Sequence, residues 1–504
     1  MDRPNILMIM ADQLAAAAVG ACGNAVVKTP HIDRLAGEGV VFEQGYCNCP
    51  LCAPSRASMV TGRLPCRTGV YDNGCELPAQ IPTFLHHLRR GGYRTILSGK
   101  MHFIGPDQLH GFEERLTTDI YPAFFHWTPN WRKGAYPNPG TSVVQLKDVG
   151  RCRWNLQLDY DEEVHFRALE RLRYLARDRA DRRPFLLCAS YTHPHDPFII
   201  TDDYWRRYDA DAIDMPAARP QPMARMHAFN RWLQVHHEAD RYPPSDELVR
   251  RARHAYYGMV SYFDDKVGAL VDELARLGLR ERTVVLVVSD HGEMMGEHGM
   301  WFKRTFYDWS ARVPLVWSWP GTWSGGRRVA EPVSLVDLFP TLLDLAEVPD
   351  RAAATHGLDG HSLVPVLEGR PDAATHGALC EYYGEGVIHC MRMLCRGRHK
   401  YVHVHTQPPL LFDLEADRLE QTNLAGRPEV AEVEQSMREE LLASWDPEAV
   451  ERDVVASQQA RLVIKEAMAH GTPISWDYQP PASAAAQYVR ARDAQQTSIE
   501  RRLD

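Results

Sequence analysis

The sequence lacks long apolar runs, an excess of basic residues and a regular cysteine framework. No stretch of about 18 apolar residues is present, which argues against a membrane-spanning helix. The formal net charge of −9 gives no general basic face, so we expect neither nucleic acid nor an anionic membrane as a partner. The 11 cysteines are odd in number and irregularly spaced, which argues against a disulfide framework.

The apolar character of the first residues raises the question of whether they form a signal peptide. Asp12 and Gln13 interrupt the apolar run 6–20, and removing that run would delete what reads as the first core strand. We therefore expect a cytoplasmic protein.

The pattern of the chain predicts an α/β fold. Short apolar runs alternate with amphipathic segments, which is typical of a large, mostly parallel sheet sandwiched by helices. The chain is also too long for one ordinary domain. The predicted strands are 4–10, 94–97, 184–191, 283–289 and 313–319, and the predicted helices are 81–91, 162–178 and 256–277.

Turn-forming residues at 367–377 predict a domain boundary. We expect an α/β domain over 1–370, a smaller α+β domain with an antiparallel sheet over 371–470, and a tail over 471–504. In the smaller domain, the predicted strands are 378–383, 388–395 and 400–405, followed by a helix over 428–442.

Polar residues follow four of the predicted strands at their carboxyl ends. In open sheets of this type, ligands bind beyond those ends. Four strands that place polar residues at one edge of the sheet indicate a functional site, because solubility alone does not require this arrangement. The residues are Asp12 and Gln13, Lys100 and His102, His195, and Asp290 and His291.

One part of this set has the chemistry of a metal site. Asp12, Gln13, Asp290 and His291 offer oxygen and imidazole ligands that suit Ca²⁺, Mg²⁺ or Mn²⁺ better than structural zinc. The alternative is that Asp12 and Asp290 each cap a helix. For either residue alone capping is the commoner role, but the two together on adjacent strands favour a metal.

A second part would hold an anion. A tetrahedral dianion needs several persistent donors, and the candidates are Arg56, Lys100, His102, His195 and Lys303. Any one of the lysines or the arginine could instead be a solvated surface charge. His195, between two prolines, could be a turn residue.

The cysteines at 47, 49 and 52 allow three interpretations: reduced thiols, part of a metal cluster, or a modified nucleophile. The third rests on the residues directly after Cys52. The run Cys52-Ala53-Pro54-Ser55-Arg56, with Thr61-Gly62-Arg63 behind it, resembles the sulfatase signature C-x-P-S-R with its trailing T-G-R. Formylglycine-generating enzymes read this motif when they oxidise its cysteine to an aldehyde.

The resemblance to sulfatases extends over nearly the whole chain and implies an alkaline-phosphatase-like fold. PNILMIMADQ, THPHDPF and SDHGEMMGEHGMWFK are similar to sulfatase segments. LHGFEERLTTDIYP and the terminal WDYQP and YVR runs are similar to choline sulfatases in particular. The Asp-Gln pair at 12–13 and the Asp-His pair at 290–291 match that branch and the phosphonate monoester hydrolases.

The resemblance implies a role for each site residue. A divalent cation, Ca²⁺ or Mn²⁺ with Mg²⁺ as a third option, would be held by Asp12, Gln13, Asp290, His291 and modified Cys52. Hydrated formylglycine would attack sulfur, His195 would protonate the leaving alcohol, and His102 would take the proton that releases sulfate. Arg56 would position the formylglycine, while Lys100 and Lys303 would hold sulfate oxygens.

The alcohol of the sulfate ester would be choline, whose quaternary ammonium is held by aromatic faces and carboxylates. Asn73 and Glu381 match positions of substrate contact in choline sulfatases, and Trp127 and Trp131 supply aromatic faces, with core packing as the alternative for both tryptophans. The family also implies a homo-oligomer, a dimer or a tetramer, in which the tail around Trp476 reaches a neighbour.

Two other functions stay open. A phosphonate monoester or phosphodiester hydrolase would use the same nucleophile and metal. A non-catalytic metal- or anion-binding protein would keep Cys52 as a thiol.

Overall fold

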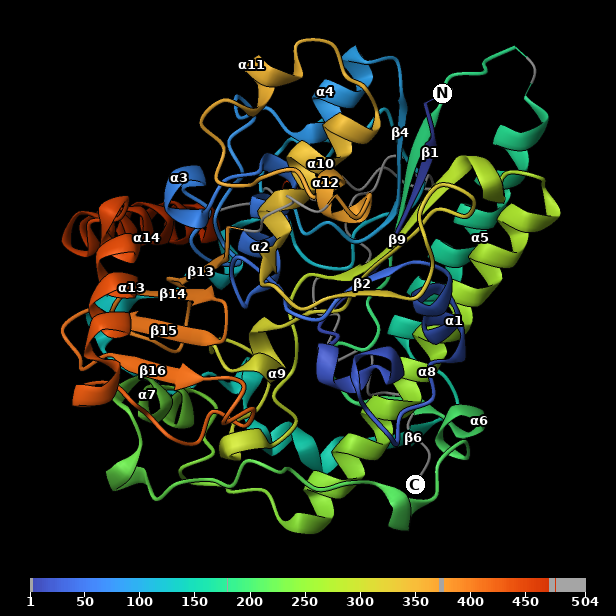
Figure 1. Cartoon of the computed structure of the whole chain (residues 1–504). Coiled ribbons are helices and arrows are strands. Elements are labelled where there is room, and N and C mark those ends of the chain that lie inside the picture. Colours follow the sequence, from blue (N-terminus) through green and yellow to red (C-terminus); the bar gives the residue numbers. More distant parts are fainter. Residues whose placement is uncertain (1–2, 179, 371–375, 471–475, 477–504) are drawn as a thin grey trace.

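The main sheet has eight strands in the order β11-β2-β10-β9-β1-β7-β4-β5 (Figure 1). The structure is a computed structural model that describes residues 3–178, 180–370, 376–470 and 476. From β9 to β5 the strands run parallel, while β10 is antiparallel to both of its neighbours. The strands are β1 (Asn5–Ala11), β2 (Val40–Phe42), β4 (Arg94–Gly99), β5 (Glu114–Arg115), β7 (Phe185–Ser190), β9 (Thr283–Ser289), β10 (Leu315–Ser318) and β11 (Arg327–Val329).

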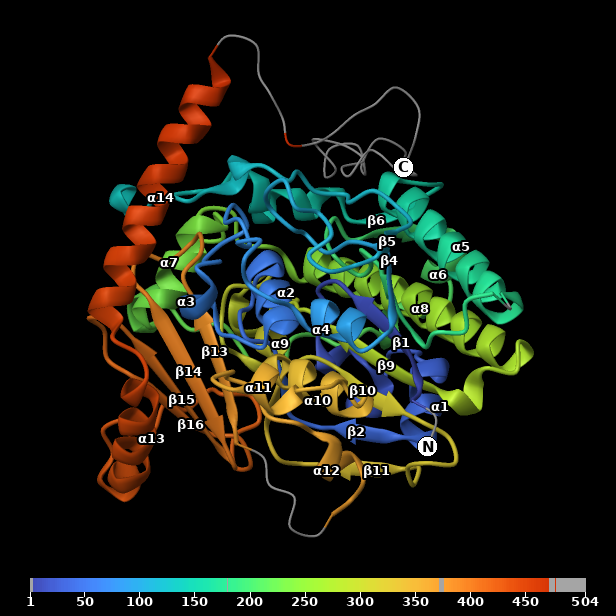
Figure 2. The same ribbon diagram turned by 90° about the horizontal axis from the view of Figure 1, so that it is seen from above.

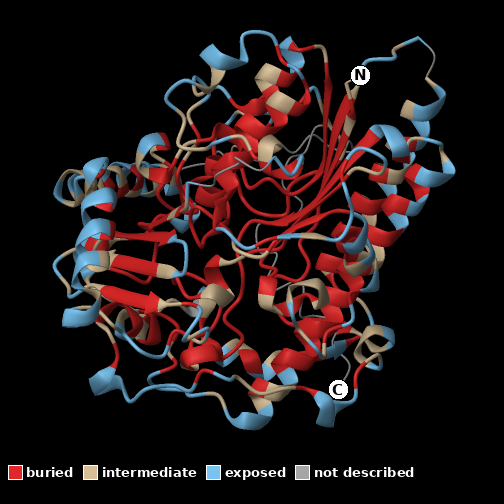
Figure 3. Ribbon diagram, in the orientation of Figure 1, coloured by how far each residue is buried: buried red, intermediate tan, exposed pale blue. Residues whose placement is uncertain are grey.

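Helices cover both faces of this sheet, and alternate residues of β1 enter two different cores. Ile6 and Met8 belong to one apolar cluster, and Leu7 and Ile9 belong to the other. The central strands β1, β4, β7 and β9 are buried along nearly their whole length (Figure 3). The mostly parallel, helix-covered sheet predicted from the sequence is confirmed. One face carries α1 (Pro30–Glu38), α5 (Leu156–Arg177) and α8 (Asp246–Arg276), and the other carries α2 (Cys52–Thr61), α4 (Phe84–Arg90) and α10 (Leu338–Leu345).

Two of the helices begin earlier than their apolar periodicity indicates. The Ser245 side chain accepts a hydrogen bond from the Leu248 N–H and starts α8 ten residues before the predicted Tyr256. Asn155 does the same for α5 through the Leu158 N–H. The first turns of these helices are defined by an N-cap side chain and by acidic residues. Because these residues are polar, the apolar periodicity of the sequence does not reveal them.

The C-terminal part forms the small antiparallel sheet that was expected. Its strands are β13 (Ala378–Tyr382), β14 (Met391–Arg396), β15 (His399–Val404) and β16 (Leu410–Asp413), and α13 (Ala431–Ala443) follows. The sequence analysis missed β16 and the long helix α14 (Pro447–Ala469). Residues 371–375 and the tail 471–504, apart from Trp476, lie outside the described residues, so the division into domains stays a prediction.

A buried ion cluster fixes the small sheet to the main body. The Lys400 ammonium of β15 lies 2.5 Å from Asp308 Oδ1 and 2.6 Å from Glu420 Oε1.

The remaining elements are β3 (Gly45–Tyr46) paired with β12 (Val333–Ser334), β6 (Gly150–Cys152) paired with β8 (Ile199–Thr201), α3 (Pro65–Thr68), α6 (Asp202–Trp205), α7 (Ala228–His236), α9 (Asp308–Ala311), α11 (Arg351–Thr355) and α12 (Val364–Leu367).

None of the described helices combines the length and the apolar character that crossing a membrane requires. The cytoplasmic location expected from the sequence stays a prediction.

Candidate active site

The carboxyl ends of β1, β4, β7 and β9 deliver the predicted polar residues to one edge of the sheet. Asp12 follows β1 and Asp290 follows β9, and these two strands are neighbours, as the metal hypothesis required. Neither aspartate is the N-cap of a described helix: Ala15 occupies the N-cap position of the turn after β1, and Asp290 pairs with Arg56. The capping alternative is therefore excluded for both.

Cys52 is the first residue of α2, so the start of this fully buried helix faces the cluster. Its Sγ lies 3.1 Å from His291 Nε2, 3.4 Å from Lys303 Nζ and 3.7 Å from Asp12 Oδ1. Burial raises the pKa of the thiol, but Lys100, Lys303 and His291 together outweigh burial and hold it well below its usual range. The site is thus built to hold negative charge at position 52.

A divalent cation fits the donor set. The ligand atoms of Asp12, Cys52, Asp290 and His291 all lie within 4.8 Å of one another and are buried. His291 Nδ1 lies 3.0 Å from the carbonyl oxygen of Gly292, to which it donates, so Nε2 presents its lone pair to the cluster. Burial and the neighbouring Asp290 raise the pKa of Asp12, and a metal ion would relieve this repulsion.

Gln13 lies at the rim of this cluster. Its side-chain oxygen accepts a hydrogen bond from Lys303 Nζ, and its amide nitrogen donates to Asp196 Oδ1 at 3.1 Å. A role for Gln13 as a metal ligand stays a prediction.

Arg56 holds Asp290 in place. Its Nε lies 2.7 Å from Asp290 Oδ2, and its Nη1 donates to the carbonyl oxygen of Lys100 at 2.6 Å and to Ser190 Oγ at 3.0 Å. Burial raises the pKa of Asp290, but Arg56, His291 and Lys100 together outweigh burial and hold this pKa below its usual range. Arg56 is thus enclosed in the protein and acts on the metal site through Asp290.

Two lysines supply the positive charge at the open side of the cluster. Lys100 Nζ pairs with Asp12, and Lys303 Nζ lies 2.8 Å from His195 Nε2 as well as close to Cys52. The side chains of Lys100 and Lys303 are buried, so neither is a solvated surface charge. Both lie where they can hold the oxygens of an anion at Cys52.

The two histidines differ in their surroundings. Burial lowers the pKa of His102, whose ring interacts with the Cys52 thiol. Burial also lowers the pKa of His195, but the Asp196 and Asp12 carboxylates and the Cys52 thiol together outweigh burial and raise it. His195 Nδ1 lies 2.7 Å from the carbonyl oxygen of Asp196. His102 is thus suited to accept a proton and His195 to donate one.

A cavity of about 240 Å³ opens from Cys52 and contains the alcohol side of the predicted site. Asn73 and Trp127 line it as expected, and the Trp127 side chain is 39% exposed. Asn73 Oδ1 accepts a hydrogen bond from the Ala53 N–H at 2.9 Å and so connects this wall to the start of α2.

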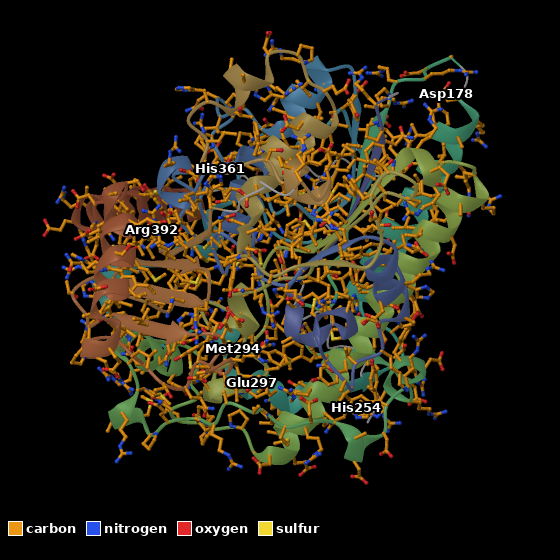
Figure 4. All side chains as sticks on the ribbon, in the orientation of Figure 1. Asp178, His254, Met294, Glu297, His361 and Arg392 are labelled. Atoms are coloured by element: carbon orange, nitrogen blue, oxygen red, sulfur yellow. The ribbon has the colours of Figure 1, made fainter. Side chains whose placement is uncertain are left out.

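Glu381 does not line this cavity, so its predicted contact with substrate stays a prediction without support from the cavity. It lies on β13 opposite Arg392 (labelled in Figure 4), with Oε1 at 3.2 Å from Arg392 Nε, and Oε2 accepts from the Cys66 N–H at 2.9 Å. The carboxylate that lines the cavity is Glu385, in the loop after β13. The sequence signal that could have identified Glu385 is its position just beyond the end of a predicted strand.

Trp131 also does not line the cavity. It is buried, and its Nε1 donates to the carbonyl oxygen of Gly384 at 2.9 Å. Core packing, the alternative considered for this residue, is the observed role.

Tyr121 and Asp196 are two residues of the site that the sequence analysis did not single out. The Tyr121 hydroxyl lies 3.2 Å from His195 Nδ1, and Lys100 Nζ lies 4.1 Å from the centre of the Tyr121 ring. Tyr121 thus touches both the anion side and, through its ring contact with Trp127, the alcohol side. No periodic pattern marks it, because it lies in an irregular loop.

Comparisons with known proteins agree with this geometry. A family profile described as sulfatase matches residues 4–348. A second profile, N-sulphoglucosamine sulphohydrolase, C-terminal, matches residues 296–446, and a third, choline sulfatase enzyme C terminal, matches residues 452–502. Both of the latter describe C-terminal parts of sulfatases.

Similar proteins span nearly the whole chain. The choline-sulfatase of Rhizobium meliloti (strain 1021) is 42% identical, over 97% of this chain and 96% of that protein. Arylsulfatase K of Danio rerio is 30% identical, over 84% of this chain and 81% of that protein. The crystal structure of the phosphonate monoester hydrolase of Agrobacterium radiobacter superposes with a TM-score of 0.68 at 28% identity, covering 90% of this chain and 96% of that one. The chain therefore belongs to the sulfatase family of sulfuric ester hydrolases.

Proposed function

We propose that this protein is a formylglycine-dependent sulfatase that hydrolyses choline sulfate to choline and sulfate. The single observation that supports this most is the position of Cys52. Its Sγ lies among a metal-type donor set, two lysines and a histidine, at the base of a cavity with an aromatic wall. The similarity to the choline-sulfatase of Rhizobium meliloti supports the choice of alcohol.

Two groups would complete this site. When bound by Asp12, Asp290, His291 and residue 52, a divalent cation would supply a Lewis acid that favours an ionised oxygen at residue 52. Oxidation of Cys52 by a formylglycine-generating enzyme would supply an aldehyde whose hydrate provides that oxygen. The thiol sulfur therefore marks the position of the reacting oxygen.

The residues of the chain bind the sulfate group and move the protons. Lys100 and Lys303 hold sulfate oxygens, and their charge persists as negative charge moves to the leaving group. His195 Nε2 gives its proton to the alcohol oxygen, a role favoured by the Asp196 and Asp12 carboxylates that raise the pKa of this imidazole. His102 accepts the proton that must leave residue 52 before sulfate is released, because burial lowers the pKa of its ring and so favours the neutral form.

The cavity provides the chemistry that a quaternary ammonium requires. Trp127 presents an indole beside the site, and Glu385 supplies a carboxylate whose Oε1 lies 2.7 Å from Arg304 Nη2. A volume of about 240 Å³ is sufficient for a small alcohol such as choline. We further propose a homodimer or homotetramer, the assembly that the family resemblance implies.

The test is turnover by protein produced together with a formylglycine-generating enzyme and loaded with Mn²⁺ or Ca²⁺. We expect choline release from choline sulfate, and its loss in Cys52→Ala. Hydrolysis of a phosphodiester with the higher kcat/KM would instead identify the phosphonate monoester hydrolase-like alternative, which shares the donor set. Absence of turnover with confirmed aldehyde and metal would contradict the proposal.

A further inference from the structure

The C-terminal helix α14 lies at the edge of the molecule, against the loop that forms one wall of the cavity (Figure 2). Residues 458, 461 and 465 share one face of this helix. Gln458 Oε1 accepts from the Trp131 N–H at 2.9 Å, and Lys465 Nζ donates to the carbonyl oxygen of His126 at 2.6 Å. These contacts bracket Trp127, so α14 fastens the loop at both sides of the aromatic wall.

Between these contacts, Arg461 makes a two-point ion pair with Asp72. Nη1 lies 2.7 Å from Asp72 Oδ1, and Nη2 lies 2.8 Å from Asp72 Oδ2. Nη1 also donates to Thr128 Oγ1 at 3.1 Å. Asp72 is fully buried and the Arg461 side chain is 7% exposed, so water screens this pair little. The bonds join residues that are 389 positions apart in the chain.

The two partners of Arg461 are the neighbours of two cavity residues. Asp72 precedes Asn73, which is bonded to the start of α2, and Thr128 follows Trp127. The two segments are in close contact, because a Cβ on Gly74 would meet the Thr128 backbone nitrogen at 2.7 Å. One guanidinium therefore joins the segment that carries Asn73 to the segment that carries Trp127.

We propose that Arg461 is a positioning residue for alcohol specificity: through Asp72 and Thr128 it fixes the wall that recognises the cationic alcohol. This inference rests on the proposed hydrolysis of choline sulfate. The anion side is held separately, by the strand ends and by Arg56. Loss of Arg461 should therefore weaken recognition of the alcohol and leave attack on the sulfate group largely intact.

The test compares two substrates on the same preparation of full-length, aldehyde-containing, metal-loaded enzyme. One is choline sulfate. The other is its carbon isostere, in which an uncharged tert-butyl group replaces the trimethylammonium group. The ratio of the two kcat/KM values does not depend on the fraction of active enzyme, so a variant that folds poorly still gives a valid result.

We expect Arg461→Met to lower this ratio about tenfold or more, mainly through the KM of choline sulfate, because small displacements of contacting groups have effects of this size. Arg461→Lys should lie between Met and wild type, because lysine keeps the charge but lacks the planar fork. Asp72→Asn should repeat the loss, and combining Asp72→Asn with Arg461→Met should add little. Gln459→Ala, on the same helix but bonded to Asn130, is the matched control.

An unchanged ratio in Arg461→Met, with both substrates falling together, would overturn the inference and leave Arg461 a purely structural residue. The same loss in Gln459→Ala would also overturn it. Failure of the wild-type enzyme to release choline is a separate outcome, because it contradicts the proposed function before any variant is compared.

Discussion

Removing the Lys303 ammonium tests the anion side of the site most sharply. Lys303 Nζ lies 3.4 Å from Cys52 Sγ and 2.8 Å from His195 Nε2, and the side chain is 4% exposed. A buried donor to a transition-state oxygen contributes about 2.7–4 kcal/mol, so Lys303→Ala should lower kcat by about 10²–10³-fold. Exposed Lys147→Ala is the matched control and should keep wild-type activity.

The same substitution makes a second prediction with a defined sign. The Lys303 charge lowers the pKa of His195, so its removal raises that pKa. His195 donates its proton, so activity persists below its pKa and is lost above it. The alkaline limb of kcat against pH should therefore move to higher pH in Lys303→Ala. Two results would refute the roles given to these residues. One is a decrease in kcat of less than about tenfold, which is too small for the loss of a transition-state donor. The other is an alkaline limb that moves to lower pH.

Other parts of the molecule yield three more predictions. Asp196→Asn removes the charge that raises the pKa of His195, so the alkaline limb of kcat should move to lower pH; a shift upward would contradict the assignment of His195 as the acid. Glu385→Gln should raise the KM for choline sulfate, whereas Glu381→Gln should leave KM unchanged and lower the melting temperature, because Glu381 pairs with Arg392. Lys400→Met leaves the buried Glu420 without its cation, while the partly exposed Asp308 keeps its pair with Arg312. The free energy of unfolding should fall by about 3–5 kcal/mol in urea titrations, with exposed Lys133→Met near zero.

The sequence predicts the sheet and the metal-type cluster well because both obey local rules. An apolar run that ends in Asp12 or Asp290 marks a buried strand and the edge where parallel strands deliver their ligands. The C-x-P-S-R motif places Cys52 and Arg56 one helical turn apart, so both face inward from α2.

The alcohol side is predicted less well because its residues lie in loops. Side-chain direction in a loop is set by tertiary contacts rather than by a period of two or 3.6 residues, so Trp131 and Glu381 were assigned to a cavity that Glu385 lines instead. The pair of Asp72 and Arg461 was missed for a related reason. Its partners are 389 positions apart, and the helix α14 that carries Arg461 was itself not predicted.

The central claim is that Cys52 is the precursor of the nucleophile, and the mass of the tryptic peptide that contains it tests this most directly. In protein from its native host, we expect the mass deficit of a thiol converted to an aldehyde, together with choline release by the same sample. An unmodified thiol in a preparation that still hydrolyses choline sulfate would contradict the formylglycine mechanism.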